Sequence, residues 1–337
     1  MVWAVANSNL ALVKYWGKAD EGAKHPASPS LSVTLDGLTT AAGVELTREL
    51  SADVVEGLPP SVVPKVERFL DAFREGFGVR SRARIVLASN FPVAAGLASS
   101  ASTFAALARA ITAAAGIEVD DGELAEVARL GSGSACRSVH GGFVEWRPQG
   151  AGSIVEPIAS KSHWERLRIV IAVTSKRPKS VGSSEGMRRT VATSPYYRAW
   201  IEGGRSDLED VRAGVHGRDL ERVGAAAERN CLRMHAAALG SNPPLLYWEA
   251  ATVAAMRRVW QLREEGIGAY FSIDAGPQVK VLCDVESEPA VKAALAAVPG
   301  VLRIIVSRPG DGARIVERAP HWVAPPAPSA RAEAAAS

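Results

Sequence analysis

The segment Asn90-Phe-Pro-Val-Ala-Ala-Gly-Leu-Ala-Ser-Ser-Ala-Ser102 constrains this chain most, because small residues in it join a strand-like stretch (83–88) to a helix-like stretch (104–115). Such a loop lets the backbone approach a ligand closely, and the start of a helix presents free N–H groups to phosphates. Three serine hydroxyls at its end could bond phosphate or Mg²⁺. They belong to Ser99, Ser100 and Ser102. A tightly packed helix start is the alternative, since the segment has neither a P-loop Gly-Lys-Ser/Thr nor a GxGxxG pattern.

Charge and cysteine content exclude several classes of protein. The 337 residues carry 39 basic and 36 acidic side chains, a net charge of +3, with no basic run of the kind that binds nucleic acid. No apolar stretch reaches about 18 residues, so we expect no membrane span. The start of the chain lacks the features of a secretory signal. Cys136, Cys231 and Cys283 have no disulfide or zinc spacing, and the chain is expected to lie in a reducing cytoplasm.

The length allows two cores of ordinary size or one large elaborated domain. Because Pro148, Gly150 and Gly152 interrupt the pattern near 148–167, we expect two domains of α+β type, at 1–165 and 166–319, followed by a flexible Pro/Ala-rich tail at 320–337. The first is predicted to contain strands at 2–6, 10–15, 32–35, 43–47, 83–88 and 143–146, and helices at 59–77, 104–115 and 121–130, the last capped near Asp120. The second is predicted to contain strands at 168–174, 269–273, 279–283 and 301–307, and helices at 220–239, 244–265 and 289–298. Two strands, a helix and a strand at its end indicate an antiparallel sheet covered by helices on one face.

Five polar clusters could carry chemistry, and each has an ordinary structural alternative. Lysines, hydroxyls, a buried arginine and a carboxylate at a tight turn could serve a ligand, or they could be strand ends, turns and helix caps. The clusters are 9–18 with Lys14 and Lys18, 25–34 with Ser28, Ser30 and Ser32, 131–138 with Arg137, 180–189 with Ser183, and 272–277 with Asp274.

Taken together, these clusters closely resemble the diphosphomevalonate decarboxylases of the GHMP kinase superfamily. The strings Lys14-Tyr-Trp-Gly-Lys18 and Gly133-Ser-Ala-Cys-Arg-Ser138 carry the resemblance, with 90–102, Glu185-Gly-Met187 and Asp274-Ala-Gly-Pro277 in the same order. The resemblance implies a two-lobed GHMP kinase fold. Its N-terminal lobe would be like domain 2 of ribosomal protein S5, and its C-terminal lobe ferredoxin-like.

The resemblance also implies a reaction. ATP, with Mg²⁺, would phosphorylate the tertiary 3-hydroxyl of mevalonate 5-diphosphate, and loss of that phosphate with CO₂ would give isopentenyl diphosphate. This is the chemistry of an ATP-dependent carboxy-lyase of the mevalonate pathway. The family further suggests a cytoplasmic homodimer that binds small molecules, with no nucleic acid and no membrane as partners.

Residue by residue, the resemblance assigns three catalytic groups: Asp274 to orient or deprotonate the 3-hydroxyl, Lys14 to keep Asp274 ionised, and Arg137 to hold the substrate carboxylate. Substrate phosphates would contact Tyr15, Lys18 and Ser134. The residues expected to bind ATP are Gly96, Leu97, Ala98, Ser99, Ser100, Ser102 and Ser183, with Ser100 nearest to Mg²⁺.

Two departures bear on the substrate. Ala27 and Pro29 stand where the family commonly has an Asn and a Ser nearby, and Gln278 stands where Asn is usual. A decarboxylase of mevalonate 5-phosphate and a 3-kinase that releases no CO₂ therefore remain alternatives. A metabolite-binding protein without catalysis is the alternative from another class.

Overall fold

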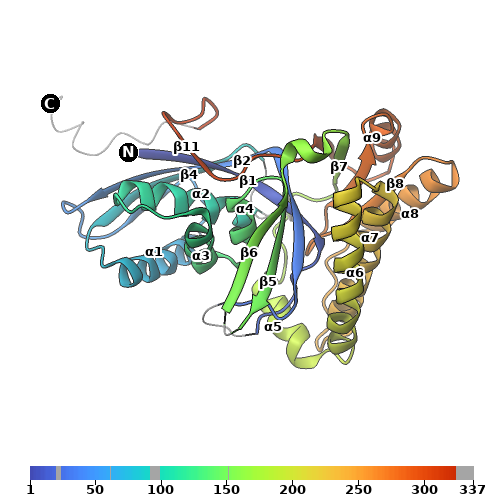
Figure 1. The fold of residues 1–337 in the computed structure, drawn as a ribbon, viewed down its shortest axis with the longest axis horizontal. Coiled ribbons are helices and arrows are strands. Elements are labelled where there is room, and N and C mark those ends of the chain that lie inside the picture. Colours follow the sequence, from blue (N-terminus) through green and yellow to red (C-terminus); the bar gives the residue numbers. More distant parts are fainter. Residues whose placement is uncertain (20–23, 61, 92–98, 151, 324–337) are drawn as a thin grey trace.

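The computed structural model describes residues 1–19, 24–60, 62–91, 99–150 and 152–323 (Figure 1). Within these ranges, the search for a helix with the length and apolarity of a membrane span finds none. The chain folds around two β-sheets, one of seven strands and one of four.

The seven-stranded sheet is built mainly from the first half of the chain. Five strands follow the order β11-β1-β2-β4-β3, and the hairpin of β5 and β6 pairs with β2. Helices α1, α2 and α3 lie on one face of the sheet (Figure 1). The strands are β1 (Val2–Val13), β2 (Ser30–Thr47), β3 (Val54–Glu56), β4 (Arg82–Ser89), β5 (Phe143–Gln149), β6 (Gly152–Ala159) and β11 (Arg314–Val316). The helices are α1 (Val63–Phe77), α2 (Ser99–Ala114), α3 (Asp121–Gly131) and the short α4 (Cys136–Val139).

The two longest strands are each one element where the sequence predicts two. Polar side chains in β1 suggest a break, but Asn9 donates its Nδ2 to Ser138 Oγ at 2.7 Å, and Asn7 donates to Asp311 O at 3.0 Å. The register shifts between Asn7 and Asn9, so a bulge absorbs the irregularity while pairing continues. The predicted cap of α3 is confirmed, because Asp120 accepts from Glu123 N at 2.8 Å in a capping box.

The second sheet has the order β10-β7-β9-β8, and all its neighbours pair antiparallel. Its strands are β7 (Leu167–Val173), β8 (Ala269–Ser272), β9 (Val279–Asp284) and β10 (Arg303–Ser307). The helices of this half are α5 (Ser183–Thr193), α6 (Tyr197–Gly217), α7 (Leu220–Leu239), α8 (Ala250–Glu264) and α9 (Glu288–Ala296). Helices α6 and α7 run side by side (Figure 1). Helix α6 and strand β6 are absent from the sequence prediction, and α8 begins six residues later than predicted.

One apolar cluster crosses from the first sheet to the second half of the chain. Leu10 and Leu31, from β1 and β2, share it with Ile169 of β7, Val211 of α6 and Val223 of α7, and all five side chains are fully buried. This shared core packs β1 and β2 against β7, α6 and α7. We keep the division of the chain near residue 166 as a proposal.

Candidate active site

Asp274 lies between two ammonium groups. Its Oδ1 accepts from Lys14 Nζ at 3.1 Å, and its Oδ2 accepts from Lys280 Nζ. Lys14 is the first residue after β1, Asp274 lies in the tight turn after β8, and Lys280 belongs to β9. The two lysine side chains are buried, whereas that of Asp274 is 20% exposed. The contact between Asp274 and Lys14 is the one that the sequence analysis expects.

The charges of this cluster hold the carboxylate ionised. Burial by itself would raise the pKa of Asp274, but the nearby charges of Lys14 and Lys280 and their hydrogen bonds outweigh burial and hold that pKa well below its usual range. Burial lowers the pKa of Lys280, and the charge of Asp274 opposes that effect. Asp274 is therefore an anion throughout the neutral pH range.

Helix α7 fixes the backbone of the turn that carries Asp274. His235 lies 2.9 Å from the carbonyl oxygen of Asp274 through Nε2, and Ile273 N donates to Cys231 Sγ at 3.2 Å. Burial lowers the pKa of His235 to about 4, so the ring is neutral at pH 7. Because a carbonyl oxygen only accepts, Nε2 carries the proton.

Arg137 is a buried cation with no acidic partner among the described residues. It lies on α4, where its Nη1 donates to Ser30 Oγ at 2.8 Å, its Nε donates to Ser32 Oγ at 3.1 Å, and Trp146 lies under the guanidinium at 5.7 Å. Burial lowers its pKa, and the charge of Asp274 is among the influences that raise it. The two groups therefore act on one another electrostatically. A buried guanidinium without a carboxylate partner is suited to bind an anionic ligand.

The residues predicted to contact substrate phosphates lie around the loop between α3 and α4. Tyr15 packs against Trp146, with ring centroids 4.7 Å apart. A Cβ atom at Gly133 would lie 2.6 Å from the Tyr15 hydroxyl, so only glycine fits there. Asn9 Nδ2 lies 3.2 Å from the backbone oxygen of Ser134, which anchors the loop to β1.

A group of basic side chains lies beside this loop. Lys24, and Lys65 of α1, lie here within electrostatic reach of Lys18, which follows β1, and of Arg68. Burial, followed by the charges of these neighbouring cations, lowers the pKa values of Lys24 and Lys65 to about 8 each. Lys24 donates to Leu130 O at the end of α3, and Lys65 lies 5.0 Å from the ring centroid of Phe104. We call Lys18, Lys24 and Lys65 the lysine group.

The predicted nucleotide side is only partly described. Gly96, Leu97 and Ala98 lie outside the described residues. Ser99 and Ser100 begin α2, and Ser100 Oγ lies 3.4 Å from Ser132 Oγ across the loop. Ser102 is fully buried, where its Oγ is bonded to Thr40 Oγ1 at 2.7 Å and to Ser99 O at 3.1 Å.

Ser183 lies at the first turn of α5, and its Oγ accepts from Lys179 Nζ at 3.1 Å. Burial lowers the pKa of Lys179, Asp274 raises it and Lys280 lowers it again. The hydroxyl of Ser183 is thus linked through Lys179 to the electrostatics of the Asp274 cluster. Gly182, rather than a serine, is the N-cap residue.

Sequence reasoning missed Lys280, Lys179 and two members of the lysine group. Lys280 had a signal, because it interrupts the apolar strand Val279-Lys-Val-Leu-Cys283, in which a fully buried lysine requires an anion. Lys24 and Lys65 had none, since Lys24 follows a short polar segment and a single lysine in an amphipathic helix, such as Lys65, is usually solvated. Gln278, noted as a departure, is fully buried and bonds the end of β7, with its Oε1 accepting from Thr174 N at 2.6 Å.

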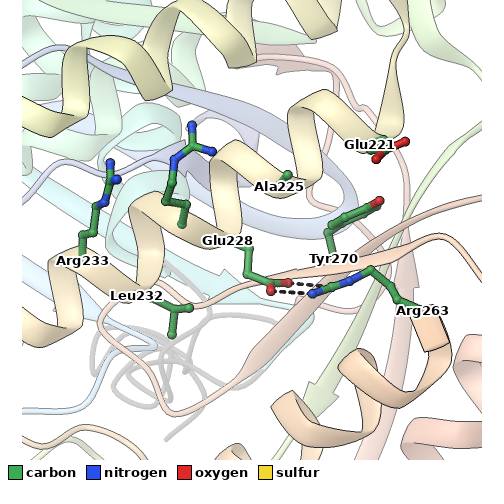
Figure 2. A pocket seen from close by; sticks show the side chains of 8 residues that line it. Glu221, Ala225, Glu228, Leu232, Arg233, Arg263 and Tyr270 are labelled. Atoms are coloured by element: carbon green, nitrogen blue, oxygen red, sulfur yellow. Dashed lines mark hydrogen bonds and ion pairs between the residues drawn. The ribbon is translucent and has the colours of Figure 1, made fainter.

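A cavity of about 510 Å³ lies elsewhere, along the face of α7 next to β8 (Figure 2). In this cavity, Arg263 of α8 forms an ion pair at 2.8 Å with Glu228 of α7. Arg233 also projects from α7 (Figure 2). Its lining residues are Glu221, Ala225, Glu228, Arg229, Leu232, Arg233, Arg263 and Tyr270. No described residue of the predicted site lines it, so we assign it no part in the chemistry.

Comparisons with known proteins agree on one family. Residues 6–154 match the model of the diphosphomevalonate decarboxylase-like N-terminal domain, and residues 169–315 match that of the mevalonate 5-diphosphate decarboxylase C-terminal domain. The diphosphomevalonate decarboxylase of Danio rerio is 36% identical over 307 residues, which cover 83% of this chain and 75% of that protein.

Solved structures show the same relationship. One is described as MDDEF in complex with MVAPP, AMPPCP and magnesium, with a TM-score of 0.88 and 37% identity. Another is a structure of the mevalonate diphosphate decarboxylase from Enterococcus faecalis, with a TM-score of 0.86 and 36% identity. It is described as showing ATP binding mediated by mevalonate diphosphate. In each case, the match covers 94% of this chain and 99% of the other. The two-lobed α+β fold predicted from the sequence is therefore confirmed, and the chain belongs to the diphosphomevalonate decarboxylase family.

Proposed function

We propose that this chain uses ATP to convert mevalonate 5-diphosphate into isopentenyl diphosphate and CO₂. The observation that carries the proposal is the ionised carboxylate of Asp274, held between Lys14 and Lys280 within electrostatic reach of the buried Arg137. Family membership supports it, as do the two relatives whose structures are described with mevalonate diphosphate, ATP or their analogues.

The first chemical step is transfer of the γ-phosphoryl group. The 3-hydroxyl oxygen forms a bond to the γ-phosphorus, the bond from that phosphorus to the ADP oxygen breaks, and the hydroxyl proton passes to Asp274. A tertiary alcohol is a very weak acid, and the low pKa of Asp274 makes it a weak base. Proton removal is therefore late, after the new bond has made the hydroxyl acidic. Asp274 orients the hydroxyl before it accepts the proton.

The second step breaks two bonds of the phosphorylated substrate. The bond from C3 to the phosphate oxygen and the bond to the carboxylate carbon break, the electron pair of the latter forms the new double bond, and phosphate and CO₂ leave. Because the carboxylate loses its charge, Arg137 does not mainly stabilise this transition state. Its two serine hydrogen bonds fix the guanidinium plane, so that it can hold the carboxylate in line with the departing phosphate.

The lysine group supports a site for the anionic ends of the substrates. Three ammonium groups beside the loop at Ser134 suit the diphosphate, with Tyr15 next to the loop, while Ser99, Ser100 and Ser183 are proposed on the ATP side. Mg²⁺ usually reaches such a site bound to nucleotide phosphates and keeps several waters, and serine hydroxyls such as that of Ser100 suit it as a ligand. No cluster of metal-ligating carboxylates, histidines or cysteines occurs among the described residues.

The decisive experiment compares two substrates. Purified protein with ATP and Mg²⁺ receives mevalonate 5-diphosphate or mevalonate 5-phosphate, and ADP and CO₂ are measured. We expect equal amounts of ADP and CO₂ from the diphosphate, with kcat/KM at least about tenfold above that of the monophosphate, a difference of about 1.4 kcal/mol. ADP without CO₂ identifies a kinase, a preference for the monophosphate reverses the substrate assignment, and no product from a folded protein rejects the proposal.

We also propose that the protein is a homodimer in the cytoplasm, as the family resemblance suggests. Light scattering behind a sizing column decides the first point. Fractionation of the source cells decides the second.

A further inference from the structure

Asn230 of α7 connects Lys14 to a carboxylate buried on α6. Its Oδ1 accepts from the backbone N–H of Lys14 at 2.8 Å, and its Nδ2 donates to Asp207 Oδ2 at 3.0 Å. Both Asn230 and Asp207 have no exposed surface. Two hydrogen bonds therefore lead from the catalytic lysine to an interior carboxylate that takes no part in the proposed chemistry.

Lys14 needs a partner at this point because the strand has ended. The last paired residue of β1 is Val13, opposite Leu31, and the next N–H is buried with no strand beside it. Asn230 supplies the missing acceptor. The lysine side chain then turns back, with Nζ donating to Ala11 O at 2.7 Å and to Asp274 Oδ1 at 3.1 Å.

Asp207 decides which way the amide of Asn230 points. The oxygen and nitrogen of an amide have the same shape, so packing alone does not distinguish the two orientations. A carboxylate only accepts hydrogen bonds, which draws Nδ2 to Asp207 and leaves Oδ1 facing Lys14. Arg229 Nε donates to Asp207 Oδ1 at 2.7 Å, and Arg233 Nη1 lies 3.3 Å from Oδ2, so the buried charge is compensated.

We propose that Asp207 and Asn230 are positioning residues for Lys14: the carboxylate orients the amide, and the amide holds the end of β1 where the lysine reaches Asp274. His235, on the same helix, holds the backbone of Asp274. Helix α7 thus sets the separation of two groups that come from different parts of the chain. The inference rests on the proposed function only in treating Lys14 as part of the active site.

The test compares Asp207→Asn with Asp210→Asn. Asp210 lies on α6, as Asp207 does, and binds the same arginine, with Oδ2 3.1 Å from Arg229 Nη2, but it is not hydrogen-bonded to Asn230. We expect kcat of Asp207→Asn to fall about tenfold and that of Asp210→Asn to stay within twofold of the wild type, with KM for ATP unchanged in both. Equal kcat values for the two variants would overturn the proposal.

A double-mutant cycle separates positioning from general stability. Asn230→Ala is expected to lower kcat about 100-fold, and Asp207→Asn should add nothing in that background, because Asp207 acts through Asn230. Additive losses would count against the proposal. Should Asn230→Ala fail to fold, the comparison of Asp207→Asn with Asp210→Asn decides alone.

Hydrogen exchange gives a readout that does not depend on activity. The Lys14 amide should exchange at least about tenfold faster in Asp207→Asn than in Asp210→Asn or the wild type. Unchanged exchange overturns the positioning role. A wild-type protein that gives no CO₂ rejects the proposed function instead, and the exchange result then still decides whether Asp207 and Asn230 hold Lys14.

Discussion

Lys14 and Asp274 are separated by 260 positions in the sequence, and Lys14 Nζ lies 3.1 Å from Asp274 Oδ1 in the structure. The contact joins the end of β1 to the turn after β8. The two groups meet because β8 packs against β1, where Ser272 Oγ donates to Ala11 O at 3.2 Å.

Removing the charge of Asp274 tests its chemical role. Asp274→Asn keeps the shape of the side chain but cannot accept the proton of the 3-hydroxyl, so we expect kcat to fall by about 10²–10⁴-fold. ATP affinity, measured by fluorescence titration, should stay within about threefold of the wild type. Turnover at the wild-type rate would remove Asp274 from the mechanism.

Removing Lys280 should change the pH dependence. Asp274 has a depressed pKa in the folded protein, so its contribution to stability is present above the unfolded value of about 3.9 and disappears as the pH falls through the folded value. The Lys280→Met substitution removes one of the two cations beside Asp274, so the pKa of Asp274 rises. The acid limb of log kcat/KM against pH should therefore move to higher pH than in the wild type, and an unmoved limb would contradict the assigned electrostatics.

Arg137→Lys tests whether orientation of the substrate carboxylate matters. A lysine keeps the charge but lacks the planar guanidinium, in which Nε donates to Ser32 and Nη1 to Ser30 while other N–H groups stay free for an anion. We expect kcat to fall about 10–100-fold, with a larger effect on CO₂ release than on ADP formation. Rapid-quench measurement of both products would reveal the difference, and equal losses in the two would argue against a role in orientation.

The lysine group predicts proton uptake on binding. With pKa values of about 8, Lys24 and Lys65 are partly neutral at pH 8, and a bound diphosphate would raise these values and draw protons from the buffer. Calorimetry at pH 8 in two buffers of different ionisation enthalpy measures this uptake. The proton uptake should be smaller in the Lys65→Met variant than in the wild type. Arg80→Met, on the loop after α1, is the control, because it also removes one positive charge. A diphosphate that binds without proton uptake would place the anion elsewhere.

Much of the fold follows from local patterns, and the exceptions have physical causes. Strands β4, β7 and β9 are close to their predicted ranges because each is a run of apolar, often β-branched residues. Helix α6 was missed because four glycines weaken its local propensity. One of them, Gly214, lets α7 come close, since a Cβ there would lie 2.7 Å from Val223. Tertiary packing, rather than local preference, makes this segment helical.

The active-site residues were predictable where they lie in sequence motifs of the family. Lys14, Arg137 and Asp274 lie in such motifs, and the structure brings Lys14 and Asp274 into contact. Lys280 and Asn230 lie in segments that read as ordinary strand and helix, so their importance comes from the arrangement in space. The roles of all these residues, and those of Tyr15, Lys18, Ser134, Ser100 and Ser183, stay predictions until the variants are measured.

The pairing of β11 with β1 means that the polypeptide leaves the first sheet after β6 and re-enters it near its end. The second lobe is thus inserted between two strands, β6 and β11, of the first sheet. Severing the chain at residue 166 would strip the first lobe of a strand and uncover the backbone donors and acceptors along one margin of β1. Neither fragment is expected to be self-sufficient, and a split version of the protein should regain activity only when both pieces are produced together.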